Sequence, residues 1–238
     1  MQRESVDMLE LNNVTSFYGK TPIIHDMNLS VKKGQCLCVL GRNGVGKSTL
    51  LRTIMGLTTS MTGTIKIDDR DFTNDATHQR SIAGVGYVPQ GRRILGKFSV
   101  RENMVLGTFA RDDKKNEIPE SCLKLFPYLA ENLDKRAGLL SGGQQQQLAV
   151  ARALATDPKV LLLDEPTEGI QPNIVEEIRN TLHHLNKDLG ITLILTEQHI
   201  KIAKKLADLF IIMDIGRTVA HGPVEELTEE LVHKHLTI

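Results

Sequence analysis

The chain has 238 residues, of which 40% are apolar and 24% are charged, and its formal net charge is zero. This composition is that of a globular protein long enough to bury a core, and it does not indicate a strongly basic nucleic-acid binder. An odd number of cysteines and a start without an apolar signal region predict reduced thiols in the cytosol. No stretch approaches the roughly 18 consecutive apolar residues that span a bilayer, so we expect any membrane role to depend on partner subunits.

Alternating apolar and polar residues predict strands early in the chain. Leu9 with Leu11, and then Leu29 with Val31, flank a turn at residues 18–22. Ile65 and Ile67 repeat the alternation before a second turn. We expect these early strands to be antiparallel and half exposed.

A glycine-rich loop follows the apolar run at residues 36–40 and precedes a helical pattern that reaches Gly56. It fits the phosphate-binding pattern G-x-x-x-x-G-K-[ST] at each required position. The loop amides and the helix N-terminus would hold phosphates, Lys47 would add charge for the outer phosphates, and Ser48 would reach Mg²⁺. The alternative is a glycine-rich turn without a ligand. The predicted nucleotide-binding residues here are Gly41, Arg42, Asn43, Gly44, Val45, Gly46, Lys47, Ser48 and Thr49.

The middle of the chain differs in pattern from both ends. A short strand at residues 85–88 stops before Gln90, and residues 91–155 then become helical and more polar. We expect this stretch to be a mainly helical lobe inserted into an α/β core. The charge run at residues 111–115 is expected to be a solvated surface.

The last third of the chain contains continuous apolar runs at residues 160–163, 191–195 and 210–213. Such runs suit parallel strands covered on both faces. A helical stripe lies between the first two, so strand, helix and strand form a right-handed crossover. A hairpin strand at 217–220 and a terminal helix at 223–236 are also expected. The stripe consists of Ile174, Ile178, Leu182, Leu185 and Leu189.

Two acidic residues, Asp164 and Glu165, stand where the first of these runs ends. Ligands of open α/β sheets collect at the carboxyl ends of strands, and a carboxylate there can hold Mg²⁺. Adjacent side chains diverge, so Asp164 can face the metal while Glu165 faces the attacking water. The alternative is an acid pair that caps the next turn. The phosphate loop alone does not separate kinases, small GTPases, helicases and transporter ATPases.

A second glycine-bearing helix start is predicted at Ser141, which is placed as an N-cap before Gly142 and Gly143. The glycines would leave the first-turn N–H groups accessible to an anion. The alternative is a glutamine-rich stretch of low complexity. Residues 186–188 resemble the base-reading motif of GTPases, but their spacing favours a solvated helix face.

Together these motifs resemble the ATP-binding subunits of ABC transporters over essentially the whole chain. Residues 41–48 resemble Walker A, residues 140–144 the signature sequence, and residues 160–165 Walker B with its catalytic glutamate. The resemblance implies nucleotide contacts by Ser141, Gly142, Gly143 and Gln144, a metal-shell and catalytic role for Gln90, and adenine stacking by Tyr18. The stretches 91–93, 141–147 and 164–172 look most like the urea-type importer ATPase, a branch of the branched-chain amino acid family.

Two stretches depart from the family pattern. The loop that often reads S-A-L-D is Glu168, Gly169, Ile170 and Gln171 in this chain. The family's switch histidine corresponds to Gln198, with His199 one residue later, and either residue could contact the γ-phosphate. Glutamine donates a hydrogen bond but takes no proton at neutral pH, so no histidine-dependent mechanism is assigned. His199 as an ordinary helix-start residue is the alternative.

The resemblance implies a single ABC ATPase domain over residues 1–238, with a mainly parallel P-loop core, an N-terminal antiparallel β subdomain and the helical insertion. It implies hydrolysis of ATP with Mg²⁺ by two head-to-tail subunits, the second being a copy or a paralogue. It further implies membrane permease subunits, an indirect substrate-binding protein, and a location at the cytoplasmic face of the cell membrane. No nucleic-acid partner is expected.

The sequence is compatible with three classes of function. The first is the energy-coupling subunit of an importer for urea, short amides or branched-chain amino acids. The second is a soluble ABC-type ATPase acting on nucleic acid or ribosomes, and the third is an ATP-binding module without turnover, which Glu165 argues against. A permease-docking surface is predicted, with local core packing as the alternative, at Arg92, Arg93, Ile94, Leu95 and Phe98.

Overall fold

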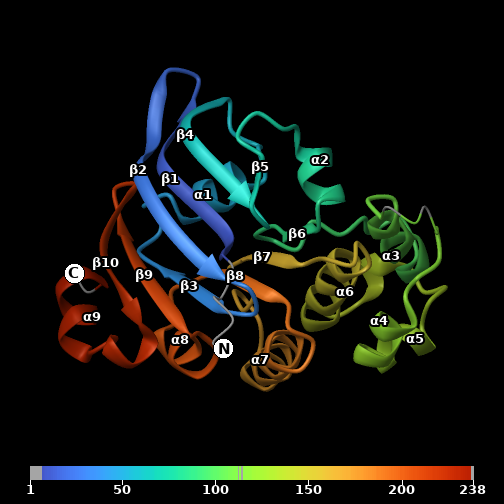
Figure 1. The fold of residues 1–238 in the computed structure, drawn as a ribbon. Coiled ribbons are helices and arrows are strands. Elements are labelled where there is room, and N and C mark those ends of the chain that lie inside the picture. Colours follow the sequence, from blue (N-terminus) through green and yellow to red (C-terminus); the bar gives the residue numbers. More distant parts are fainter. Residues whose placement is uncertain (1–6, 112, 114, 237–238) are drawn as a thin grey trace, which may run out of the picture.

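The computed structural model describes residues 7–111, 113 and 115–236. Within these residues the strands form two sheets, and helices lie beside and between them (Figure 1). The predicted α/β class, with an antiparallel N-terminal sheet and a mostly parallel second sheet, is confirmed.

The smaller sheet is antiparallel and has the strand order β2-β1-β4-β5. Leu11 lies opposite Leu29 on one side of β1 and opposite Ile65 on the other. In the sheet's third strand in chain order, β4, less exposed residues alternate with exposed ones, as the sequence pattern predicted. The strands are β1 (Asp7–Tyr18), β2 (Thr21–Lys32), β4 (Ser60–Ile67) and β5 (Arg70–Asp71).

The larger sheet has the order β10-β9-β3-β8-β7-β6 and is parallel except for β10, which forms a hairpin with β9. The central strands are buried along their whole length, and this explains the continuous apolar runs in the sequence. The strands are β3 (Cys36–Leu40), β6 (Val85–Val88), β7 (Val160–Asp164), β8 (Thr192–Glu197), β9 (Leu209–Asp214) and β10 (Arg217–Pro223).

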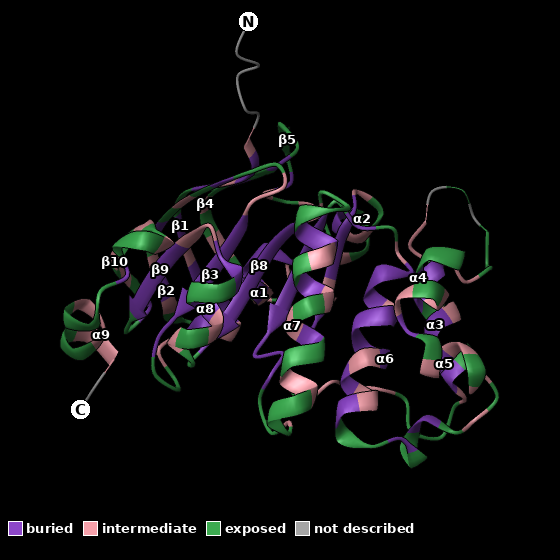
Figure 2. Cartoon of the chain, turned by 90° about the horizontal axis from the view of Figure 1, so that it is seen from below, coloured by how far each residue is buried: buried purple, intermediate pink, exposed green. Residues whose placement is uncertain are grey.

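Each parallel strand contributes to two separate cores because successive side chains point to opposite faces. Leu37 and Val39 of β3 pack with the small sheet and α1, whereas Cys36 and Cys38 pack with α6, α7 and α8. The buried helix faces turn toward this sheet and their exposed faces turn to solvent (Figure 2). The sheet is therefore the shared layer between the antiparallel sheet and the outer helices.

The helices fall into three groups. α1 (Lys47–Ile54) lies between the sheets and α2 (Thr77–Ile82) precedes β6. Helices α3 to α6 lie together on one side of the molecule, in the stretch predicted to be helical (Figure 1). They are α3 (Val100–Thr108), α4 (Glu120–Leu125), α5 (Pro127–Glu131) and α6 (Gly142–Leu154), with a 3₁₀ turn at Ala137–Leu139. The third group follows in the last part of the chain and consists of α7 (Pro172–Lys187), α8 (Ile200–Leu206) and α9 (Glu229–Leu236), with a 3₁₀ turn at Val224–Glu226.

Three expectations about helices need correction. Leu189 lies beyond the end of α7 and is half exposed, because the helix ends at Lys187 and Gly190 takes a left-handed conformation. Asn186 is buried rather than solvated, and its amide donates to the carbonyls of Gly34 and Ile191. The terminal helix begins only at Glu229, after a short 3₁₀ turn.

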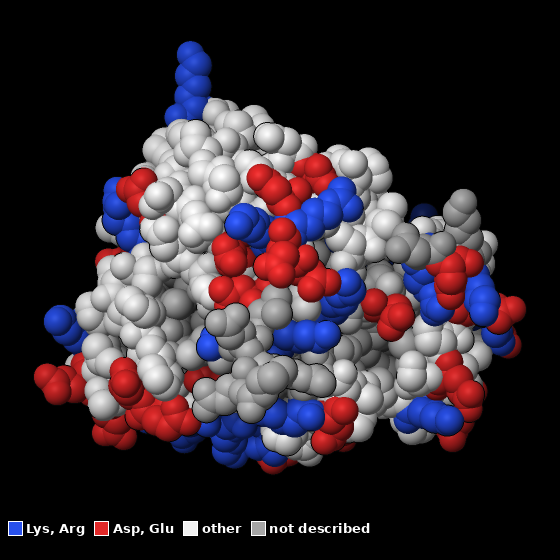
Figure 3. Space-filling model, viewed as in Figure 1, with Lys and Arg blue, Asp and Glu red and all other residues white. Residues whose placement is uncertain are grey.

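The surface carries both signs of charge. Lys and Arg side chains lie among Asp and Glu side chains over the face shown in Figure 3. Among the helices of the described residues, none combines the length and the apolar character needed to cross a bilayer.

Parallel pairing brings the carboxyl ends of four strands to one edge of the sheet. β3 leads into the glycine loop, its neighbour β8 into Gln198, and then β7 into Glu165 and β6 into Gln90. Residues far apart in the sequence therefore meet at this edge.

Candidate functional site

The glycine loop joins β3 to α1, and Gly41, Gly44 and Gly46 in it all have positive φ, which favours glycine. A Cβ on Gly41 would lie 2.7 Å from Val45 Cγ2 and 2.8 Å from the Met213 carbonyl oxygen. Gly46 has φ of 108° and precedes α1 with no side chain capping that helix. The first-turn N–H groups of α1 therefore have no side-chain acceptor at the cap, and they are suited to bind an anion.

Lys47 is the buried cation of the site. Its side chain is 4% exposed, and its Nζ lies 2.9 Å from the Gly41 carbonyl oxygen, 3.1 Å from that of Arg42 and 3.0 Å from Glu165 Oε1. The ammonium group thus ties the loop to the acidic strand end. A phosphate group that entered the loop would compete with these carbonyls for the same charge.

Asp164 has one satisfied and one unsatisfied oxygen. Ser48 Oγ and Thr196 Oγ1 each donate to Oδ1 over 2.9 Å. Oδ2 is buried and has no hydrogen-bond partner among the described residues. An unpaired oxygen on a carboxylate that bonds to Ser48 fits a hard cation such as Mg²⁺, which prefers oxygen ligands. Gln90 lines the same hollow as Ser48 and offers a further amide oxygen.

Glu165 turns away from Asp164 because its backbone adopts φ of 48°, a region that side-chain-bearing residues rarely occupy. Its N–H donates to Thr196 Oγ1 over 2.9 Å. Its carboxylate accepts from Gln198 Nε2 at 3.1 Å and from Gln90 Nε2 at 3.3 Å, besides the Lys47 ion pair. Strain of this kind persists where the surroundings hold a functional side chain in place.

The structure separates the two candidate switch residues. Gln198 Nε2 bridges Glu165 and Asn43 Oδ1, the latter at 2.7 Å, so its amide joins β8 to the glycine loop. His199 is exposed and occupies the position before α8, without capping it. Both line a hollow of about 210 Å³ next to Glu165, but only the Gln198 side chain bonds to the Glu165 carboxylate.

Three further residues of the site were given no functional role from the sequence. Thr196 binds both acidic neighbours, and Glu168 accepts from Gln90 Nε2 over 2.9 Å. Glu197 is buried, and burial raises the pKa of its carboxyl group while the Thr167 hydroxyl, 2.7 Å away, opposes that rise. Thr196 and Glu197 end the apolar run of β8, so the strand-end rule applied to Asp164 would have found them.

Tyr18 lies at the end of β1, outside the phosphate hollow. That hollow is about 250 Å³ and is lined by loop residues together with Ile23, Gln90 and Glu165. The Tyr18 ring is partly exposed, and its hydroxyl lies 3.4 Å from Arg52 Nη1. A flat group that extends from the loop toward β1 would find an aromatic face there.

The second glycine-bearing helix start, at α6, is closed on itself by a capping box. Gln144 N–H donates to Ser141 Oγ over 3.3 Å, and Ser141 N–H donates to Gln144 Oε1 over 3.0 Å. Gly142 is exposed as predicted. Gly143 is buried and lies so close to α7 that a Cβ there would be 2.4 Å from Ile174 Cγ2. α1 and α6 lie in different parts of the molecule in both views (Figures 1 and 2).

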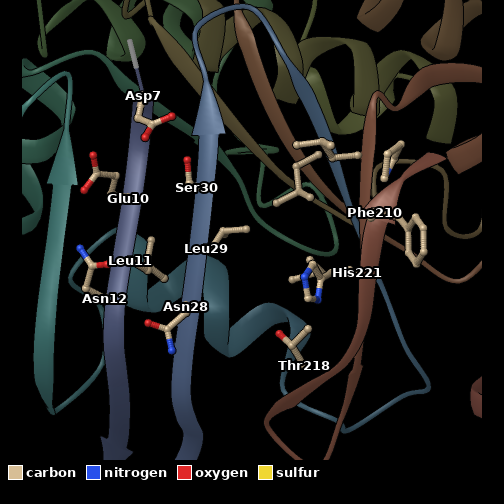
Figure 4. A pocket seen from close by; sticks show the side chains of 15 residues that line it. Asp7, Glu10, Leu11, Asn12, Asn28, Leu29, Ser30, Phe210, Thr218 and His221 are labelled. Carbon is tan, nitrogen blue, oxygen red and sulfur yellow. The ribbon is translucent and has the colours of Figure 1, made fainter. Parts of the chain in front are cut away.

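A larger hollow, of about 600 Å³, lies apart from this chemistry. It opens between β1–β2 and the β9–β10 hairpin, with Leu11, Leu29 and His221 among its lining residues (Figure 4). It shares no lining residue with the phosphate hollow.

Comparison with known proteins agrees with this geometry. Residues 24–168 match the ABC transporter family model. The chain is 38% identical, over 90% of its length and 92% of the relative's, to the high-affinity branched-chain amino acid transport ATP-binding protein BraG of Pseudomonas aeruginosa. It is 34% identical, over 93% of its length and 94% of the relative's, to the probable branched-chain amino acid transport ATP-binding protein LivF of Archaeoglobus fulgidus.

Solved structures are similar over the same extent. The ATP-binding cassette MJ1267 of an ABC transporter superposes with a TM-score of 0.81 at 28% identity, over 93% of each chain. The cassette MJ0796, a dimer in a post-hydrolysis state with ADP and Pi, gives a TM-score of 0.79 at 27% identity, over 91% of this chain and 99% of that one. The chain therefore belongs to the ABC transporter family, as one of its ATP-binding and ATP-hydrolysing cassettes.

Proposed function

We propose that this chain is the ATP-hydrolysing subunit of a membrane importer for a small solute of the branched-chain amino acid, urea or short-amide group. The observation that carries the hydrolytic part is the Glu165 carboxylate, which Lys47, Gln90 and Gln198 hold beside the phosphate loop. The relatives BraG and LivF, both described as branched-chain amino acid transport proteins, support the importer part. The urea-like stretches of the sequence keep urea and amides among the candidates.

In this proposal the triphosphate of ATP binds the loop amides and the start of α1. Lys47 exchanges its contacts with the loop carbonyls and Glu165 for the outer phosphates. Glu165, no longer paired with that ammonium, then orients the attacking water or takes its proton. Ser48, Gln90 and Asp164, through its free Oδ2, would hold Mg²⁺. Bound there, the ion would neutralise charge on the phosphates.

Gln198 serves as the γ-phosphate contact in place of a switch histidine. Its amide already reaches Asn43 of the loop and the Glu165 carboxylate. An amide can donate to a phosphate oxygen but cannot carry a proton, so the proton must remain with Glu165 or solvent. His199, at the rim, is not required in this arrangement.

A second subunit completes the site. Ser141, Gly142, Gly143 and Gln144 would contact the ATP held on the phosphate loop of an opposing copy or paralogue, in a head-to-tail pair. The separation of α1 from α6 within one chain supports this. Tyr18 would stack on adenine. The whole of residues 1–238 would act as one cassette, with residues 91–155 as its helical lobe.

Permease subunits would dock at a cleft of about 320 Å³ between the sheet core and the helical lobe, lined in part by Met55, Tyr87, Leu95 and Leu106. Two of the large apolar side chains that line it are exposed, Leu95 at 39% and Leu106 at 40%, and Phe98, three residues after Leu95, is also exposed. Of the five predicted docking residues, Ile94 packs against the core instead, and the Arg92 side chain points to α6. The protein would thus act at the cytoplasmic face of the membrane, with a substrate-binding protein as an indirect partner.

Reconstitution of the transport complex tests the proposal. The tagged chain would be used to isolate its membrane subunits from native membranes, and the complex would be placed in proteoliposomes. ATP-dependent uptake of labelled leucine, urea or acetamide is expected, and Glu165→Gln should abolish it. If the tagged chain isolates no membrane subunits from native membranes, or if the complex imports none of these solutes, the proposal is wrong.

A further inference from the structure

The segment directly after Gln90 has an unusual backbone. Gly91, Arg92 and Arg93 all have positive φ, of 74°, 68° and 47°. Two consecutive arginines in this region cost conformational energy that glycine would avoid. Contacts elsewhere must therefore hold this segment in place.

The Arg92 side chain supplies one such contact, at two segments at once. Its Nη2 lies 3.4 Å from the Gly169 carbonyl oxygen, in the loop after Glu165. Its guanidinium nitrogens also lie 3.2 and 3.4 Å from the position that a Cβ on Gly142 would occupy. The guanidinium therefore covers the first residue of α6 while it bonds to the exposed loop at Gly169.

Arg152 fastens the same segment to the other end of α6. Its Nη2 donates to the carbonyl oxygens of Arg92 and Arg93, over 3.2 and 2.9 Å. Residues 142 and 152 are about 15 Å apart along a helix axis. The segment is thus attached to both ends of the helix that begins at Ser141.

The Arg92 guanidinium and the start of α6 carry charge of the same sign. A helix N-terminus carries partial positive charge, so a guanidinium beside it is unfavourable while no anion is present. An arriving phosphate would be attracted by both. The Arg92 guanidinium is therefore placed to attract the phosphates of a nucleotide that another molecule brings to the start of α6.

We propose that Arg92 is a positioning residue for the ATP bound by the opposing subunit. It holds the start of α6 and the loop at Gly169 in one geometry, and it adds positive charge where the neighbour's phosphates arrive. This inference rests on the proposed pairing of two subunits. It also moves Arg92 from the predicted permease surface to the nucleotide interface.

The proposal predicts that loss of Arg92 acts in trans. Each pair has two ATP sites, and the α6 that covers a site comes from the other copy. Pairs would be assembled from full-length copies with two different affinity tags. One copy would carry Glu165→Gln, so that only the unmodified copy hydrolyses ATP.

Arg92→Asn would then be placed on either copy, because asparagine tolerates positive φ and the backbone penalty is avoided. On the inactive copy it should lower kcat at the partner's site about tenfold, as expected for loss of a charged hydrogen bond, with little change in KM. On the active copy the loss should stay below about twofold. Arg92→Lys on the inactive copy should restore part of the rate, because lysine keeps the positive charge but lacks the planar guanidinium group.

Arg101→Gln is the matched control, because Arg101 lies in the same lobe and pairs with exposed Asp134. It should leave kcat unchanged from either copy. Equal losses from both placements of Arg92→Asn, or no loss from either, would overturn the inference. Thermal unfolding of each variant separates a folding defect from the effect in trans. If unmodified copies fail to pair in ATP, the proposed pairing itself is wrong.

Discussion

The two helix starts that the sequence marks with glycine, at α1 and α6, are built in opposite ways. The start of α1 has no side-chain cap, and the buried Lys47 and Glu165 lie beside it. The start of α6 is exposed at Ser141 and Gly142 and is closed by its own capping box. The first is surrounded by its own chain, and the second faces solvent.

This difference separates two tasks. A site that performs chemistry needs its charged groups buried and fixed before the substrate arrives, because their interactions are stronger away from water. A surface that meets another molecule needs to be stable when it is alone, and a capping box provides that. We therefore expect variants around α1 to lower turnover or stability, and variants of the exposed residues at the start of α6 to weaken pairing.

Glu165→Gln should have the largest effect, and it tests the α1 side. Loss of the carboxylate removes the group that orients or deprotonates water, so turnover should fall by about 10³-fold. Binding of a fluorescent ATP analogue should persist, because the loop amides and Lys47 remain. Glu176→Gln, on the exposed face of α7, is the control in the same phosphate-release assay. Near-normal turnover of Glu165→Gln would contradict the assignment.

Arg80 holds the other end of α1, and its loss should be the largest effect on stability. Its side chain is 2% exposed and donates to the carbonyl oxygens of Thr53, Ile54, Thr73 and Asp75. Arg80→Met would leave these buried acceptors unpaired, so we expect a loss of about 3 kcal/mol and a Tm lower by roughly 8 °C.

Arg70→Met is the matched control for Arg80→Met. Arg70 forms an exposed ion pair with Asp75, which should be worth less than about 1 kcal/mol. Calorimetry of both variants compares them directly. Equal losses would mean that Arg80 does not anchor the end of α1.

Gly143→Ala tests how α6 is seated against α7, with Gly142→Ala as its neighbour and control. The new methyl group at 143 would meet Ile174 Cγ2 at 2.4 Å, so overpacking should cost about 2 kcal/mol in urea unfolding. At 142 it would meet only the end of the flexible Arg92 side chain, at 3.2 Å, and the cost should be small. Ile174→Ala should relieve the first effect in the double variant. Equal costs at both glycines would contradict this account of α6.

The sequence predicted most of the fold because its signals are local. Continuous apolar runs specified the buried parallel strands, and alternation specified the antiparallel ones. The boundaries of α7 and α9 were predicted less well, because helix ends depend on backbone geometry such as that of Gly190. Asn186 was misjudged because its partners, Gly34 and Ile191, meet it only in the folded chain.

The site could be predicted in part for the same reason. The glycine loop, Asp164 and Glu165 carry local patterns, and the structure brings them together with Gln90 and Gln198. The bond from Gln198 to Glu165 depends on the direction of the side chain at the end of β8, which no local pattern in the sequence specifies. The contacts of Arg92 join three segments, and no single stretch of sequence records them.

Ser141→Ala should affect stability less than Arg80→Met or Gly143→Ala, and it tests directly whether the start of α6 meets another subunit. Removal of the cap should cost about 1 kcal/mol, and Ser99→Ala, which removes the same capping box from α3, should cost a similar amount. Only Ser141 is proposed to meet a phosphate. In a Glu165→Gln background, size-exclusion chromatography with ATP should therefore show weakened pairing for Ser141→Ala and normal pairing for Ser99→Ala. Both variants lose the same kind of helix cap, so a difference in pairing between them would come from the phosphate contact of Ser141. Equal pairing would mean that Ser141 serves only as a helix cap.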